Sequence, residues 1–186
     1  MGSHPANILL RKAAATALGL LTIAGGVAPV QAKTTPGLAK TVVVSRLSFL
    51  NTEGLEFGSL LAGTTAGTVI VSPTGVRTKT GGVTLVGGLV QPARFAGRGS
   101  LNQTVLVSLT ANNSTLRRVG GTETMTLDQL TIGSTPTAVL TTRPQSFRIG
   151  SPTGIFNFPI GGRLNVNANQ VPGDYEGTFN VTLNYQ

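Results

Sequence analysis

Apolar and polar residues alternate most regularly in the last stretch of the chain, Gly173 to Gln186. The apolar and aromatic positions of this alternation are Tyr175, Phe179, Val181, Leu183 and Tyr185, and the residues between them are mostly polar. A period of two with aromatic and β-branched residues predicts a strand with one buried and one solvent-facing side. We therefore expect a terminal strand that needs a neighbour to pair with.

Shorter alternating runs fill the chain before this stretch, and Gly, Pro and Asn residues separate them. They predict strands at residues 41–49, 55–61, 67–72, 81–90, 93–97, 103–110, 122–132, 147–149, 155–160 and 163–167. Met125, Leu127, Leu130 and Ile132 are expected to point inward. Pro159 predicts an edge strand or a strand end. Eight to ten short strands at this spacing are typical of an all-β sandwich or barrel.

The first 32 residues have the pattern of an export leader. Arg11 and Lys12 precede an apolar run, and Val30-Gln31-Ala32 is a small-residue cleavage site. We interpret residues 1–32 as a signal peptide that is removed. The alternative is a retained membrane anchor, but Gly25, Gly26 and Pro29 interrupt the run where a spanning helix should continue.

Composition narrows the possible functions. Residues 33–186 carry a net charge of +6 and contain neither Cys nor His. The arginines are scattered and no aromatic residues are interleaved with them, so the charge does not predict nucleic-acid binding. An exported chain without Cys depends on packing and strand pairing rather than on disulfides.

Catalytic chemistry has few candidates in this sequence. Without His or Cys, the common nucleophile–base pairs and zinc sites cannot form. The remaining acids are Glu53, Glu56, Glu123, Asp128, Asp174 and Glu176. A carboxylate-based hydrolase would need two of them facing across a cleft, and calcium would need a D-x-D-x-D-G loop that is absent. We expect no enzyme activity, no cofactor and no metal.

The C-terminal stretch resembles the β-zipper of chaperone–usher pilus subunits from Gram-negative bacteria. That motif has a Gly fourteen residues from the end, alternating apolar residues and a penultimate Tyr. Here these are Gly173, then Phe179, Val181 and Leu183, then Tyr185. L-E-F-G (55–58), G-T-V-I-V-S-P-T-G (67–75) and I-G-G-R-L-N-V (160–166) are similar to secreted pilin-like domains of unknown function, which are related to the spore coat protein U-like group. Many pilus subunits carry a disulfide and this chain has none, which leaves the archaic or alternative branches open.

The resemblance implies an immunoglobulin-like sandwich that lacks one strand. In such subunits a periplasmic chaperone fills the open groove and anchors the C-terminal carboxylate, here that of Gln186. At an outer-membrane usher, the N-terminal extension of another copy replaces the chaperone strand, which is a form of β-augmentation. The resemblance thus implies a surface fibre with a role in adhesion, exported through the periplasm, whose mature chain is not stably inserted in a membrane.

Residues 33–49 are the candidate donor strand, and residues 50–186 are the expected pilin-like domain. The donor residues are Leu38, Val42, Val43, Val44 and Leu47, and the groove residues are Gly173, Tyr175, Phe179, Val181, Leu183, Tyr185 and Gln186. Two registers are open, one with Leu38, Val42 and Val44 inward, the other with Val43, Leu47 and Phe49 inward. Residues 41–49 could instead be the chain's own first strand, in a self-contained sandwich that binds a glycan or a protein.

Overall fold

The computed structural model describes residues 36–186, so the predicted signal peptide lies outside the described residues. The chain divides into two units, Met1–Thr41 and Val42–Gln186. Of the first unit, residues 36–41 are exposed and form no regular secondary structure. The second unit is the folded domain, and its regular structure consists only of strands.

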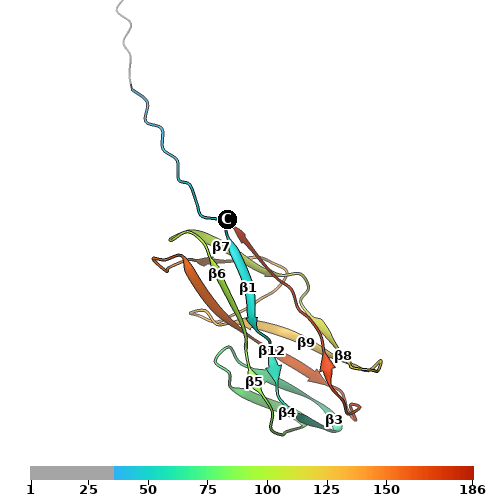
Figure 1. The fold of residues 1–186 in the computed structure, drawn as a ribbon. Helices are drawn as coiled ribbons and strands as arrows, with labels where there is room; N and C mark the ends of the chain where they lie inside the picture. Colours follow the sequence, from blue (N-terminus) through green and yellow to red (C-terminus); the bar gives the residue numbers. More distant parts are fainter. Residues whose placement is uncertain (1–35) are drawn as a thin grey trace, which may run out of the picture. The chain divides into compact units, whose positions relative to one another are not determined.

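The larger sheet of the domain is built on β12, Ile155–Val166, which is twelve residues long. Its path is β1 (Ser48–Glu53), β6 (Ala93–Arg98), β12, β9 (Thr124–Ile132), β8 (Ser114–Arg118) and β13 (Tyr175–Glu176). The hairpin of β3 (Leu60–Val71) and β4 (Arg77–Leu85) continues the sheet where β3 pairs with β12, and β10 (Ala138–Val139) pairs with β9. Figure 1 shows β1, β6 and β12 side by side, in agreement with their antiparallel pairing.

The second sheet has three strands in the order β11 (Gln145–Arg148), β7 (Thr104–Leu109) and β14 (Val181–Tyr185). A small ladder joins β2 (Glu56–Phe57) to β5 (Val90–Gln91). The two main sheets pack face to face, since Val107 and Leu109 of β7 share a buried cluster with Phe95, Leu127 and other residues of the larger sheet. The predicted all-β sandwich is therefore confirmed.

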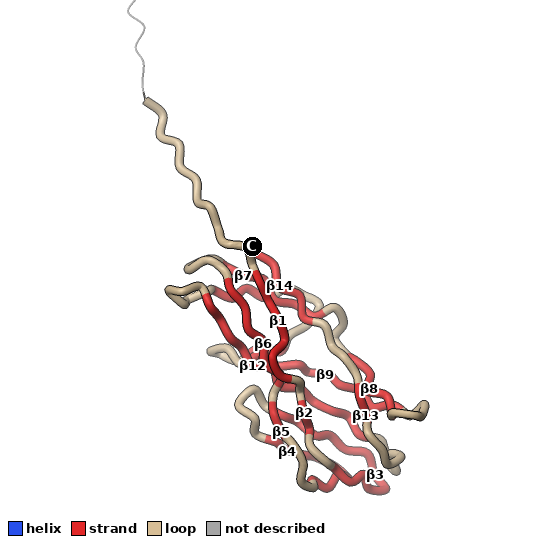
Figure 2. Tube along the Cα trace, in the orientation of Figure 1, coloured by secondary structure: helices blue, strands red, loops and turns tan. Residues whose placement is uncertain are grey.

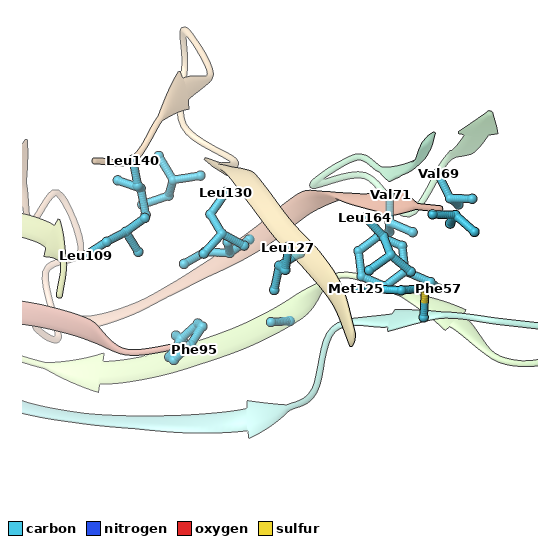
Figure 3. Close-up of a cluster of buried hydrophobic side chains, with 14 of the residues drawn as sticks. Phe57, Val69, Val71, Phe95, Leu109, Met125, Leu127, Leu130, Leu140 and Leu164 are labelled. Atoms are coloured by element: carbon cyan, nitrogen blue, oxygen red, sulfur yellow. The ribbon is translucent and has the colours of Figure 1, made fainter. Parts of the chain in front are cut away.

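The core extends along the space between the sheets. Figure 3 shows buried side chains from Phe57 and Val69 at one end to Leu109 and Leu140 at the other. Phe57 is buried, and Phe49 and Leu55 pack against the cluster, so these residues belong to the domain's own core.

A bulge in β9 explains an irregular set of buried residues. Met125 and Leu127 are buried, and so are Leu130 and Ile132, although the spacing between the two pairs breaks a period of two. Between Arg163↔Asp128 and Gly161↔Thr131, β9 has one residue more than β12, and Gln129 has a positive φ of 46°. Because of the extra residue, Leu130 and Ile132 point toward the interior as Met125 and Leu127 do. All four predicted inward residues are therefore confirmed.

Several predicted boundaries are wrong. The predicted strand at 41–49 is irregular up to Leu47, and β1 begins at Ser48. The break predicted at Gly161-Gly162 lies inside β12, where Gly161 faces the close backbone of Val71 and Ser72. The predicted strand at 81–90 is β4, which ends at Leu85, followed by β5 at Val90. The described residues hold fourteen strands rather than eight to ten, because β8 and β10 carry weak alternation and because short pieces such as β2, β5 and β13 are separate strands.

Pro159 lies inside a central strand, which contradicts its predicted edge position. It pairs with Arg94 of β6 on one side, and its carbonyl accepts a hydrogen bond from Gly133 N on the other. The nitrogen and carbonyl of one residue point to the same side of a strand. β9 ends its pairing at Ile132, so the nitrogen of Pro159 faces a position where no ladder bond is lost.

Stacked phenylalanines join β1, β6 and β12. Phe95 stacks on Phe49 at 5.2 Å and on Phe158 at 5.6 Å between ring centroids, and meets the edge of Phe179 at 6.1 Å. Phe156 continues the stack, at 6.3 Å from Phe158. Phe95 is therefore the ring shared by the first sheet and the segment that leads into β14.

We expect Phe95→Ala to lower the free energy of unfolding by about 3–5 kcal/mol, because it removes a buried ring with three aromatic neighbours. Urea unfolding measured by circular dichroism checks this value. The matched variant is Phe156→Ala, whose ring is less buried and has one aromatic neighbour, and its loss should be clearly smaller. Equal losses for the two variants would contradict a central role of Phe95.

Candidate functional site

The terminal stretch divides between the two sheets. Tyr175 and Glu176 form β13 and pair with Arg118 and Arg117 of β8 in the larger sheet. The chain then crosses over, and Val181–Tyr185 form β14 in the smaller sheet. The prediction of one continuous strand from Gly173 to Gln186 is therefore wrong. A period of two does not reveal that the chain leaves one sheet at Gly177, whose Cα lies close to the backbone of Thr115 and Leu116.

β14 is an edge strand with one neighbour. It pairs with β7 from Val181↔Leu109 to Tyr185↔Val105, and within residues 36–186 no strand pairs with its other edge. Its alternation is real: Val181, Leu183 and Tyr185 lie toward the interior, while Thr182 and Asn184 are exposed. The inward residues of β7 are at most 4% exposed, but those of β14 are only partly buried.

β1 is the corresponding edge of the larger sheet. It pairs only with β6, and its inward residue Phe49 is partly buried. Phe179, just before β14, contacts Phe95 of β6, which stacks on Phe49 of β1. At the other end of β14, Tyr185 is hydrogen-bonded to Ser45, just before β1. β1 and β14 therefore border the same side of the sandwich, which we call the β1–β14 side (Figure 2).

An apolar pocket lies on the β11 side of the smaller sheet. It has a volume of about 180 Å³ and lies between the sheets. Its walls include Val105, Val107, Phe147, Phe156, Phe158 and Leu183. Leu183 is the one β14 residue in its lining, and Phe147 and Arg148 place the pocket beside β11, at the opposite edge of the smaller sheet from β14.

The predicted donor residues are largely exposed. Leu38 is 83% exposed, Val42 79%, Val43 92% and Val44 41%. Leu47 differs, because it is partly buried with its side chain close to Gly99. The structure thus distinguishes Leu47, which is partly buried, from four exposed residues.

Two residues at this site carry no signal in the sequence. Ser100 lies in the loop between β6 and β7, and its Oγ accepts a hydrogen bond from Ser45 N at 2.6 Å. The hydroxyl of Tyr185 accepts from Ser100 N at 2.9 Å and donates to the Ser45 carbonyl at 2.8 Å. Isolated serines in polar stretches cannot be assigned such a role before the fold brings them together.

Three of the six carboxylates are paired with arginines. Glu53 pairs with Arg94, Glu123 with Arg118 and Asp128 with Arg163, at 2.9, 2.7 and 2.8 Å respectively. Within residues 36–186, no three acidic residues gather into a possible metal site. The hydrogen bond from Arg118 lowers the pKa of Glu123 to about 2, with a further contribution from backbone donors. The hydrogen bond from Arg163 likewise lowers the pKa of Asp128.

Residues 47–185 match a family described as a domain of unknown function, DUF4402. The chain belongs to this family. The match begins next to Ser48, where β1 starts, and ends at Tyr185, so it covers the sandwich. No curated protein and no solved structure matches the chain. Among residues 36–186, no helix has the length and apolarity needed to span a bilayer.

The ion pairs of Glu123 and Asp128 predict acid sensitivity. Their folded-state pKa values lie below the unfolded values, so the stabilisation is fully present above about pH 4.5 and is lost as the pH falls toward 2. We expect the melting temperature to fall over this range, and Glu123→Gln and Asp128→Asn to flatten that fall. Glu176→Gln is the matched control, since Glu176 is exposed and forms none of the ion pairs found in the described residues. An equal pH profile for all three variants would contradict the role of the two pairs.

Proposed function

We propose that this protein is a structural subunit of a bacterial surface fibre. Each copy donates its N-terminal segment to the β1–β14 side of another copy, after a periplasmic chaperone and an outer-membrane usher have handled it. The observation that carries the proposal is that one chain contains both an unpaired strand edge and a set of exposed apolar residues. Among residues 36–186, β14 pairs along one edge and its apolar side chains are partly exposed, while Leu38, Val42, Val43 and Val44 are exposed.

A free strand edge with apolar side chains is a site for pairing with another chain. Such edges are normally blunted by charge, proline or a covering segment, but β14 has the sequence Val181-Thr-Leu-Asn-Tyr185, with no charged residue and no proline. A strand added here would form backbone hydrogen bonds to β14 and place alternate side chains over Phe49 and Leu183.

The contacts of residues 45–49 favour one donor register. Phe49 belongs to β1, Leu47 lies against Gly99, and Ser45 is hydrogen-bonded to Ser100 and Tyr185. The register that would use Val43, Leu47 and Phe49 therefore needs residues that the domain already uses. The other register uses Leu38, Val42 and Val44, all outside the core.

The expected gain from this register is comparable to the stability of a domain. Burying three aliphatic side chains at about 1.5–3 kcal/mol each gives roughly 5–9 kcal/mol before backbone hydrogen bonds and ordering costs. Small domains have free energies of unfolding of about 5–15 kcal/mol. A subunit joined in this way would leave its neighbour very slowly, as a fibre outside the cell requires.

A strand-transfer experiment tests the proposal. The first protein is residues 45–186, and the second is the same protein followed by a short linker and residues 36–44. The fused strand can turn back from β14 as an antiparallel hairpin. We expect the second protein to be monomeric and to melt about 10 °C or more above the first.

The control is the same fusion with Leu38, Val42 and Val44 each changed to Ser, which keeps the backbone and removes the apolar side chains. It should melt close to residues 45–186 alone. Equal melting temperatures for all three proteins would refute the proposal. They would favour a self-contained sandwich that binds a glycan or a protein.

Single substitutions test the register in the chain from residue 33 to residue 186. Val44→Asp should abolish multimers, because it places a charge among apolar side chains of the neighbouring copy. Val43→Asp is the matched control, since the adjacent residue points to the opposite side of the donated strand. Size-exclusion chromatography with light scattering measures both, and loss of multimers with Val43→Asp alone would reverse the register.

A further inference from the structure

One hydrogen-bonded cluster joins three distant parts of the domain at the end of β14. Tyr185 Oη donates to the carbonyl of Ser45 and accepts from Ser100 N, and Ser100 Oγ accepts from Ser45 N. Ser45 and Tyr185 are 140 residues apart in the sequence. Both backbone polar groups of Ser45 are therefore bonded to the domain, just before the exposed donor residues.

Packing around the cluster holds the same point. A Cβ on Gly99 would lie 2.8 Å from Tyr185 Oη, 3.2 Å from Leu47 Cδ1 and 2.6 Å from Ile149 Cδ1. The ends of the Ile149, Tyr185 and Leu47 side chains therefore crowd position 99. The segment from Ser45 to Leu47 is thus held by hydrogen bonds on one side and by apolar contact on the other.

This anchor determines how the chain's own segment can approach β14. β1 begins at Ser48, near the Tyr185 end of β14, and runs toward the Phe179 end. This direction follows because Asn51 of β1 pairs with Phe95, and Phe95 contacts Phe179. β1 and β14 therefore run in opposite directions. With Ser45 held at the Tyr185 end, residues 36–44 could lie between the two strands only after a tight reversal, and then only parallel to β14.

A second copy has no such restriction. Its segment can enter from either end and pair antiparallel with β14, which is slightly more stable per residue than parallel pairing. Pairing of residues 36–44 with β14 of the same copy would also require the chain to reverse at Arg46 and Leu47. Leu47, however, already lies against Gly99.

We infer that Tyr185 and Ser100 form a directional clamp that turns the N-terminal segment away from its own β14 and makes it available to another copy of the chain. The inference rests on the proposed function and assigns to Tyr185 a task other than lining the site for an incoming strand. Tyr185 and Ser100 are positioning residues here, because they act through Ser45 rather than by contact with the donated strand.

The test compares Tyr185→Phe with Tyr175→Phe in residues 33–186. Both changes remove one hydroxyl with two hydrogen bonds, but the Tyr175 hydroxyl bonds to Val171 and Gln170, far along the chain from Ser45. Hydrogen–deuterium exchange read by mass spectrometry can follow the peptides containing Ser45 and Ser100, whether the protein is multimeric or not. We expect exchange there to be roughly threefold to tenfold faster in Tyr185→Phe, and unchanged in Tyr175→Phe.

The second measurement is the fraction of monomer at fixed protein concentration. Without the clamp the segment can fold back, so Tyr185→Phe should raise the monomer fraction at least severalfold, while Tyr175→Phe should match the unmodified chain. If Tyr185→Phe fails to fold, Ser100→Ala removes the acceptor for Ser45 N and should give the same two changes.

The outcomes separate the clamp from the fibre. Unchanged exchange at Ser45 and Ser100 overturns the clamp, whatever the protein assembles into. An unmodified chain that multimerises and a Tyr185→Phe chain that multimerises equally also overturn it, and leave the proposed fibre intact. An unmodified chain that stays monomeric at high concentration overturns the proposed fibre itself, and the clamp's directional role falls with it.

Discussion

The free edge of β14 is the constraint on which the rest of the structure depends. A buried backbone N–H or C=O needs a hydrogen-bond partner. A strand with one neighbour pairs the backbone groups along one edge, and the groups along its other edge have no strand to pair with. β7 has neighbours on both sides, and its inward residues are almost fully buried, whereas those of β14 are not. The difference between two adjacent strands with the same alternation comes from the number of neighbours each has. On the facing sheet, the inward residue Phe49 of β1 is likewise only partly buried.

Away from the β1–β14 side, the larger sheet is held together mainly by one strand, β12. β12 pairs with β6 and β3 along one edge and with β9 along the other, so one strand holds most of the larger sheet together. The phenylalanine stack ties β1 to this strand through Phe95 and Phe158. Asp128 of β9 and Arg163 of β12 form a bidentate ion pair, next to the bulge at Gln129. β12 thus lies inside the larger sheet, two strands away from β1.

The sequence predicted the class of fold and the inward residues well, because both depend on local alternation. Its errors have a common physical origin. Glycine was interpreted as a turn at Gly161-Gly162 and at Gly63, but these residues allow close approach of neighbouring backbones within continuous strands. Tyr175 fits the alternation of the last stretch, yet it pairs with Arg118 in the other sheet. Alternation records which residues are apolar, and it does not record which strand lies beside them.

The candidate site was predictable in part for the same reason. Phe179, Val181, Leu183 and Tyr185 could be named because their pattern is local, whereas Ser45 and Ser100 are joined to Tyr185 only by tertiary structure. The anchoring of Ser45 has a mechanical consequence. In the proposed fibre, Val44 would be the last donated residue and is covalently joined to Ser45, which is hydrogen-bonded to its own domain, so no flexible linker would separate one subunit from the next. A filament joined in this manner would transmit bending and torque from subunit to subunit, and would behave as a stiff rod rather than as beads on a string.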